Sequence, residues 1–386
     1  MASSMQIADT TPHAAGKFNP HLGAAQRVYE HLLKCHWNGR MLLGPDPGVR
    51  FQVRIWRFAK SYLRFLPWKD DRYYMQCQGY WIRNNWTLFR MTGDNRYRQV
   101  ALQATESILQ AQKPEGYWEY PPPSWTNRIA TVEGCYAALG LLASHHEDKR
   151  FWDAAVRWTR FLIDKIGFQE LDGVKAIHYF YNRGKSMVPN NTTLVLELLG
   201  EMYAASGKEE YLLHVPGMIG FLRLAQLESG EFPYAYDSPF EKGKTHFLCY
   251  QYNAFQFLDL FSYWKSTRDD AILPLLKKSA LYLATGIDRK SGRGKYNCRQ
   301  SFPEVTYYTA VLAAALREAS LAGFGAFSDL SEKAYARVLD RQMRNGNFIY
   351  SSRNYGILSD RRSYPRYLNM ILRHLLIRAD QSTGLN

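Results

Sequence analysis

Apolar and polar positions along this chain form two kinds of helical pattern. One kind is rich in small residues and apolar almost all round, which is typical of a buried helix, and the other has a charged outer face, which is typical of a covering helix. The first kind is predicted at 71–90, 128–144, 190–206, 246–264, 304–320 and 363–378. The second kind is predicted at 95–111, 149–165, 209–226, 269–285 and 328–343.

Two more helices are predicted before this alternation begins, at 22–36 and 51–66. Counting 51–66 as an outer helix gives six inner and six outer helices, so the predicted fold is an all-α (α/α)6 toroid with short hairpin-like loops. Residues 1–20 contain no apolar core of a signal peptide, and we expect them to be a disordered lead. Residues 21–386 are then expected to form a single toroid domain.

A loop motif recurs between the hairpins. Its fullest copy is QKPEGYW at 112–118, and each copy carries a turn glycine; these are Gly116, Gly173, Gly230, Gly292 and Gly346. A nearly fixed period indicates one supersecondary unit used repeatedly around the fold. We expect the glutamine of the motif to tie the end of an outer helix to the loop, and the aromatic residue to fill the gap between hairpins.

The net charge and the absence of certain motifs indicate which kinds of ligand and partner to expect. Net charge is +14, with 49 Lys+Arg against 35 Asp+Glu, which favours an anionic ligand. The sequence shows no nucleic-acid-binding signature, so no nucleic acid is expected. The longest apolar runs fall short of the roughly 18 residues needed to span a bilayer, so stable membrane insertion is not expected and a cytoplasmic location is the default. The oligomeric state is left open.

The five cysteines are scattered and form no CxxC pair. This pattern predicts neither a disulfide framework nor a structural zinc site. Since no other metal-ligand spacing is evident either, we expect no metal and no cofactor.

The inner helices of such a toroid begin at one common end. Helix N-termini carry unpaired N–H groups and partial positive charge, so this end favours anionic or hydroxyl-rich ligands. Polar residues at the helix starts are therefore the site candidates. The candidate catalytic residues are Tyr250, Tyr252, Glu133, His246 and Tyr308. The candidate substrate-binding residues are Arg128, Asn127, Asn191, Asn253, Tyr74, Gln78, Trp125, Arg362 and Arg366.

This mixture of Tyr, Asn and Arg suits removal of a proton next to a carboxylate. Arg and Asn would neutralise the carboxylate, and Tyr or His would move the proton. A tyrosine can act as the base only where cations lower its pKa from about 10. Tyr250 and Tyr252 lie two positions apart, so at most one is expected to face the cavity. Hydrolysis ranks lower, because Glu133 and Glu304 lie on non-adjacent inner helices.

Several candidates also have structural interpretations. Asp70, Asn127, Asn190 and Ser363 are suitable N-cap residues. Arg128 and Glu133 could form an ion pair across a helix start, and His246 could be a satisfied core histidine.

Two family resemblances follow from these motifs. The Gln-x-x-x-Gly-x-Trp loop is similar to the QW motif of squalene and terpene cyclases, which also use α/α toroids; only the copy at 112–118 is intact, and the Asp-x-Asp-Asp acid of class II cyclases is absent. Three other stretches resemble six-hairpin carbohydrate enzymes, in particular the C-terminal domain of glucuronyl C5-epimerases and the related uronate lyases. These stretches are 78–97, GYWEYP at 116–121 and HFLCYQYNAFQFLDL at 246–260.

The second resemblance implies Tyr, Glu, Asn and Arg groups around C5 of a uronate. The matching positions here are Tyr250, Tyr252, Asn253, Glu133 and Arg128. The β-rich N-terminal domain of the animal epimerases has no counterpart in this chain.

Three hypotheses result. The first is an enzyme that acts on an acidic, uronate-containing glycan by proton abstraction, as an epimerase or a lyase. The second is a terpenoid or meroterpenoid cyclase with an aromatic-lined cavity, for which Asp71 or Asp237 is the alternative acid. The third is a toroid that binds a ligand without catalysis, which would lack titratable groups with shifted pKa values.

Overall fold

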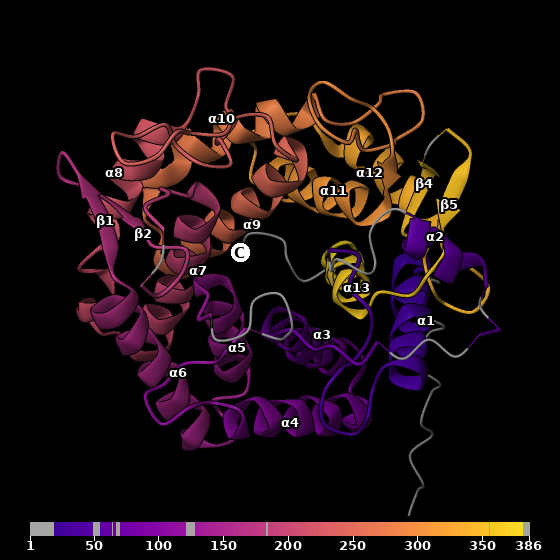
Figure 1. Ribbon diagram of the computed structural model, residues 1–386, viewed down its shortest axis with the longest axis horizontal. Helices are drawn as coiled ribbons and strands as arrows, with labels where there is room; N and C mark the ends of the chain where they lie inside the picture. The colour runs from indigo at the N-terminus through magenta and orange to yellow at the C-terminus, as the bar shows by residue number, and fades with distance from the viewer. Residues whose placement is uncertain are drawn as a thin grey trace, which may run out of the picture.

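The computed structural model of the chain describes residues 19–48, 55–63, 65–66, 70–120, 128–182, 184–354 and 356–380. Within these ranges the dominant elements are two concentric sets of helices (Figure 1). The inner set is α3 (Met75–Thr92), α5 (Thr131–Ala143), α7 (Pro189–Ser206), α9 (Cys249–Thr267), α11 (Thr306–Leu321) and α13 (Pro365–Ala379). The outer set is α1 (Pro20–Cys35), α4 (Asn95–Gln110), α6 (Lys149–Phe161), α8 (Val215–Ala225), α10 (Leu273–Ala284) and α12 (Ser328–Leu339).

The inner helices form a closed ring. Each one contacts the next in the order α3, α5, α7, α9, α11, α13, and α13 contacts α3 again. The outer helices pack on the inner ring, for example α4 on α3 and α12 on α11, and α10 contacts both α9 and α11. The predicted (α/α)6 toroid is therefore confirmed.

Small residues allow the inner helices to approach closely. A Cβ atom on Gly79 of α3 would lie 2.1 Å from the carbonyl oxygen of Tyr136 on α5. On α11, the run Ala313, Ala314 and Ala315 is fully buried. These helices are apolar nearly all round because they contact inner neighbours on two sides and an outer helix on a third.

One predicted helix has a different role from the expected one. The sixth outer helix is α1, which packs on α13, and the prediction that 51–66 fills this position is wrong. The described part of that segment forms the short helix α2 (Ile55–Tyr62), which contacts strand β5 (Leu358–Asp360). The apolar stripe of α2 indicated a helix, but its packing partner depends on contacts distant in sequence.

The repeated loop joins neighbouring hairpins. Gln112 Nε2 donates to the carbonyl oxygen of Gly116 within its own loop and to that of Ala154 on the next outer helix, α6, both at 2.9 Å. Gln342 Nε2 likewise donates to Gly346 at 3.3 Å and to Ala24 of α1 at 2.9 Å, and so closes the ring. The predicted structural role of these glutamines is confirmed.

The aromatic residues of the motif are buried as predicted, and one copy of the loop has a different structure. Trp118, Phe232 and Phe348 are each only 1% exposed, as expected for residues that fill gaps between hairpins. The copy around Gly173 differs, because it forms a β-hairpin of β1 (Phe168–Leu171) and β2 (Val174–Ile177) with Gln169 paired to Ala176. Gly173 is the turn of this hairpin, and a Cβ atom added there would meet no other atom within 4 Å.

The remaining strands lie at the last hairpin. β3 (Glu304–Val305), β4 (Ser351–Asn354) and β5 form an antiparallel sheet in which Glu304 pairs with Ser352 and Ser351 with Asp360. Short helical turns extend the outer layer at η2 (Leu162–Ile166), η3 (Glu209–Leu212) and η4 (Asp270–Ile272). None of the helices in the described ranges is long and apolar enough to cross a membrane.

Candidate active site

A cavity of about 270 Å³ lies where the inner helices begin. The first turn of every inner helix contributes a polar side chain to it. These residues are Gln76, Glu133, Asn190, Gln251, Tyr308 and Arg366. Tyrosines form much of the rest of the wall; they are Tyr120, Tyr136, Tyr179, Tyr252, Tyr307, Tyr350 and Tyr367. Such a wall combines flat apolar faces with hydroxyl groups, which suits the faces and hydroxyls of a sugar ring.

Glu133 is a carboxyl group on this wall. It belongs to the first turn of α5, and its Oε2 accepts hydrogen bonds from the backbone N–H of Met75 at 2.6 Å and of Gln76 at 3.2 Å. These are the first amides of α3, so the carboxylate caps the N-terminus of a neighbouring inner helix. Within the part of the chain that the structure describes, Arg128 does not pair with Glu133, and its guanidinium lies 5.2 Å from the ring centroid of Phe180.

Burial raises the pKa of Glu133 to about 7. The side chain is only 1% exposed, and loss of hydration outweighs the opposing effects of Arg366 and of the two backbone N–H groups. A carboxyl group with this pKa can accept and release a proton near neutral pH, which is the property required of a general acid–base group.

The raised pKa has a consequence for stability. The folded protein holds a proton on Glu133 up to about pH 7, whereas the unfolded chain releases it near 4.5. Stability therefore falls as pH rises between these values, by about 3 kcal/mol in total. We expect Glu133→Gln to unfold at a higher temperature than the wild type at pH 8, and the advantage to shrink at pH 5. Calorimetry at both pH values measures this, and a larger advantage at pH 5 would contradict it.

Arg366 is the cation beside Glu133. Its Nη2 lies 2.8 Å from Asp46 Oδ2 and donates to Tyr367 Oη at 2.7 Å, and its guanidinium lies 4.4 Å from the ring centroid of Tyr74. Its Nε is buried and has no hydrogen-bond partner among the described residues. Arg366 therefore retains donor capacity for a ligand carboxylate.

Two threonines at inner-helix starts hold the loops that carry wall tyrosines. Thr131, which begins α5, donates its N–H to the carbonyl oxygen of Tyr179 at 3.0 Å. Thr306, which begins α11, donates its N–H to that of Tyr350 at 2.9 Å. Unpaired helix N–H groups are satisfied in this way by loop carbonyls, which brings tyrosines from distant loops to the cavity.

The wall tyrosines are not bases at neutral pH. Burial raises the pKa of Tyr252 and of Tyr308 above 10, and it raises that of Tyr367 to about 12 despite the neighbouring Arg366. Arg366 acts to lower the pKa of Tyr252 and of Tyr367, but burial outweighs it, so the base hypothesis finds no tyrosine with a lowered pKa on the described wall. These hydroxyl groups stay protonated and can donate hydrogen bonds or protons.

A second carboxyl group, Asp259 of α9, also lines the cavity. Its Oδ2 accepts a hydrogen bond from Thr193 Oγ1 at 3.1 Å, and burial together with nearby Glu197 raises its pKa well above the usual value. Asp259 therefore favours its protonated form.

Four residues of the sequence-based site line the cavity. They are Glu133, Tyr252, Tyr308 and Arg366, with Tyr74 stacked behind Arg366. Tyr250 is directed elsewhere, since its hydroxyl lies 3.0 Å from Thr285 Oγ1 and its ring stacks on Tyr282. Trp125 and Asn127 lie outside the described residues.

The other predicted residues have structural contacts away from the cavity wall. Gln78 bonds both backbone polar groups of Leu42, and Asn253 does the same with Phe232. Arg362 pairs with Asp70. Neither Asp70 nor Asn190 is the N-cap that the sequence suggested, because the cap of α3 is Tyr74 and that of α7 is Val188. Ser363 is not the cap of α13 either, which is Tyr364.

Asn191 and three further candidates also lie off the wall. Asn191 is fully buried but is not among the lining residues, whereas its neighbour Asn190 is. Asp71 and Asp237 are exposed at the surface. His246 precedes α9 rather than lying in an inner helix, and its Nδ1 is 2.8 Å from Glu231 Oε2.

Some wall residues were not among the site residues predicted from the sequence. Tyr120, Tyr179 and Tyr350 come from loops that precede inner helices, and Asp259 lies almost three turns into α9. A search restricted to helix starts misses them. The density of tyrosines in the loops just before each inner helix was the available signal.

Comparison with known proteins supports the fold. The chain is similar to a cellobiose 2-epimerase from Bacillus thermoamylovorans, with a TM-score of 0.72, 13% identity, and 94% and 99% of the two chains covered. It is also similar to a sugar epimerase from a ruminal bacterium (TM-score 0.70, 11% identity, 95% and 99% covered). A glycosyl hydrolase family 88 protein from Bacteroides vulgatus is a further neighbour (TM-score 0.65, 13% identity, 93% and 98% covered).

These neighbours share the (α/α)6 toroid with the chain. No protein-family model matches the sequence, and no curated protein is significantly similar to it. At 11–13% identity the likeness extends to the fold and not to individual residues.

Proposed function

We propose that this protein is an enzyme that acts on a uronate-containing glycan by removing the proton from the carbon that bears the carboxylate. The observation that carries the proposal is Glu133, a buried carboxyl group with a pKa of about 7 in a cavity walled by tyrosines. Solved toroids of the same fold include sugar epimerases and a polysaccharide lyase, which is consistent with this class of reaction.

The residues can divide the reaction between them. Arg366 binds the sugar carboxylate, which makes the neighbouring C–H more acidic. The Glu133 carboxylate takes that proton, and the electron pair of the C–H bond moves into the carboxylate as an enediolate. Tyrosine hydroxyls on the wall stabilise the developing charge by hydrogen bonds.

Two outcomes can follow. In epimerisation, a protonated group on the other side of the ring returns a proton to the same carbon, and Tyr252 is the candidate donor. In elimination, the electron pair expels the substituent on the adjacent carbon and leaves an unsaturated sugar. Both begin with the same proton transfer to Glu133.

The test is incubation of the protein in D2O with glucuronate- and mannuronate-containing glycans, followed by mass spectrometry. Epimerisation predicts deuterium at the carbon that bears the carboxylate, and elimination predicts a new unsaturated end. If every glycan stays unchanged, the proposal fails.

Hydrolysis is a second candidate, because Asp259 places another carboxyl group on the same cavity wall. Glu304, the partner considered from the sequence, is held by Arg337 and Arg341 at 2.7 Å each and does not line the cavity. Hydrolysis would give new reducing ends without carbon-bound deuterium, so the same assay separates the two. The cyclase hypothesis has no acid at Asp71 or Asp237 within the cavity, since both are exposed.

Tyr252 and Tyr250 form a matched pair for testing the tyrosine role. Tyr252→Phe removes a hydroxyl from the cavity wall, and we expect the rate of exchange or elimination to fall at least tenfold. Tyr250→Phe removes a hydroxyl that bonds Thr285 instead, and the rate should stay within about twofold. Steady-state rates of both variants measure this. Equal effects would show that Tyr252 has no special position.

A further inference from the structure

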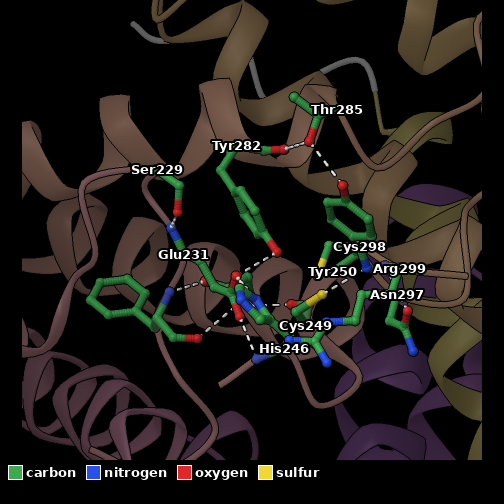
Figure 2. Close-up of polar contacts among 12 residues, drawn as sticks. Ser229, Glu231, His246, Cys249, Tyr250, Tyr282, Thr285, Asn297, Cys298 and Arg299 are labelled. Carbon is green, nitrogen blue, oxygen red and sulfur yellow. Dashed lines mark hydrogen bonds and ion pairs between the residues drawn. The ribbon is translucent and has the colours of Figure 1, made fainter. Parts of the chain in front are cut away.

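A cluster of three side chains that could hold a metal ion lies beside the start of α9 (Figure 2). None of the three lines the central cavity. Glu231, His246 and Cys298 each offer one ligand atom, and these atoms all lie within 4.8 Å of one another. The three residues come from different parts of the chain: the loop after α8, the residues just before α9, and the loop between α10 and α11.

Glu231 anchors the cluster. Its side chain is only 1% exposed, and its carboxylate accepts hydrogen bonds from His246 N at 2.9 Å and from Tyr282 Oη at 3.0 Å. His246 Nδ1 lies 2.8 Å from the same carboxylate, so two candidate ligand groups already meet at one point.

A second sulfur lies next to the first. Cys249 Sγ accepts a hydrogen bond from Cys298 N at 3.1 Å, so the two cysteines are neighbours (Figure 2). A metal ion bound here would displace the thiol proton of Cys298, because a thiol that coordinates a cation is deprotonated.

We propose that Glu231, His246 and Cys298 bind one Zn²⁺ ion. Zinc takes a mixture of carboxylate oxygen, imidazole nitrogen and thiolate sulfur, and it prefers four ligands in a tetrahedron. Ligand atoms at about 2.0–2.3 Å from zinc stand roughly 3.3–3.8 Å apart, so atoms within 4.8 Å need only a small movement. The hydrogen bond between His246 and Glu231 gives way to metal bonds, since a proton and Zn²⁺ compete for the same lone pairs.

The presence of a nitrogen and a sulfur ligand favours zinc over magnesium or calcium. Those two ions take oxygen ligands almost exclusively, and here only Glu231 supplies oxygen. The sequence did not suggest a metal because the ligands are 15 and 52 positions apart and belong to no compact motif.

The ion would connect three segments around the start of α9. That helix start carries Leu248 and Tyr252, which line the central cavity. Zinc would therefore stabilise the part of the rim that holds Tyr252, while taking no part in proton transfer. The metal site does not depend on the proposed function, and its test does not use activity.

Protection of Cys298 from alkylation tests the site in the wild-type protein. The full chain is stripped with a chelator, incubated with or without Zn²⁺ alone, and treated with iodoacetamide, and each cysteine is read by mass spectrometry. Cys298 is exposed, so it should react, and Zn²⁺ should slow its reaction at least tenfold. Cys35, exposed on α1, is the internal control and should react at an unchanged rate. Equal rates at Cys298 with and without Zn²⁺ would overturn the proposal.

Stoichiometry gives a second, independent measurement. Titration of the stripped protein with Zn²⁺ should show one equivalent bound, and Co²⁺ should give a thiolate-to-cobalt absorption band. His246→Ala should weaken binding at least tenfold, whereas Asp237→Asn, which changes an exposed carboxyl group in the same loop, should not. Binding of Zn²⁺ by His246→Ala with wild-type affinity would contradict the site, and so would the absence of a cobalt band in the wild type.

Discussion

Replacing Glu133 by glutamine is expected to reduce deuterium exchange or elimination by at least 100-fold. Glutamine keeps the shape of the side chain and can still accept the N–H groups of Met75 and Gln76, but it cannot take a proton. General acid–base groups contribute typically about 10²–10⁴-fold to rate. Single-turnover rates of wild type and variant on the same uronate glycan measure the effect.

The pH profile provides the control for this variant. Since the base must be ionised, the wild-type rate should rise between pH 5 and 7 and level off above the pKa of Glu133, which burial raises to about 7. The residual rate of Glu133→Gln should lack this rise. Because the variant is expected to be more stable than the wild type at pH 8, unfolding cannot explain a lost rate. A variant within threefold of the wild type would show that another group is the base.

The second large effect is expected at the loop that closes the ring. Gly346 has φ +85°, and a Cβ atom there would lie 2.2 Å from the carbonyl oxygen of Arg27 on α1. An L side chain in this left-handed conformation costs about 1–2 kcal/mol, and the contact with rigid backbone adds to it. We expect Gly346→Ala to lower the free energy of unfolding by at least about 3 kcal/mol.

Gly173 is the control for the positive φ alone, because it is the turn glycine of another copy of the motif, the one that forms the β1–β2 hairpin. Its φ is +82°, almost the same, but no atom lies within 4 Å of a Cβ position. Gly173→Ala should therefore cost only about 1–2 kcal/mol from the backbone conformation. Urea denaturation of both variants measures the difference. Equal losses would mean that the contact with α1 contributes little.

The repeat predicts the fold because its glutamine and its glycine contact the next outer helix at successive hairpins. Gln112 and Gln342 use the same two acceptors, a carbonyl in their own loop and one on the next outer helix. Gly230 and Gly292 likewise approach the backbone of the next outer helix, at Lys278 and Lys333. Because these contacts recur at successive hairpins, the same residue types recur at a nearly fixed period in the sequence, and the toroid could be predicted from that period.

The candidate site could be predicted only in part. Glu133, Tyr252, Tyr308 and Arg366 were identified because they belong to the first turns of inner helices, where a toroid places its mouth. The sequence could not decide whether Tyr250 or Tyr252 faces the cavity, because both are tyrosines near the start of the same helix. Two positions on a helix differ by about 200°, and which of them faces the cavity depends on how α9 is rotated against its neighbours.

The sequence by itself determined the alternation of buried and covering helices, the loops between them, and the end of the ring at which polar side chains gather. These features depend on helical periodicity and on residues that contact the next hairpin. Only the tertiary structure decided that α1 rather than 51–66 closes the ring, and that burial raises the pKa of Glu133. It alone placed Glu231, His246 and Cys298 together. Burial and the meeting of distant loops are set by packing over the whole ring, and no local pattern records them.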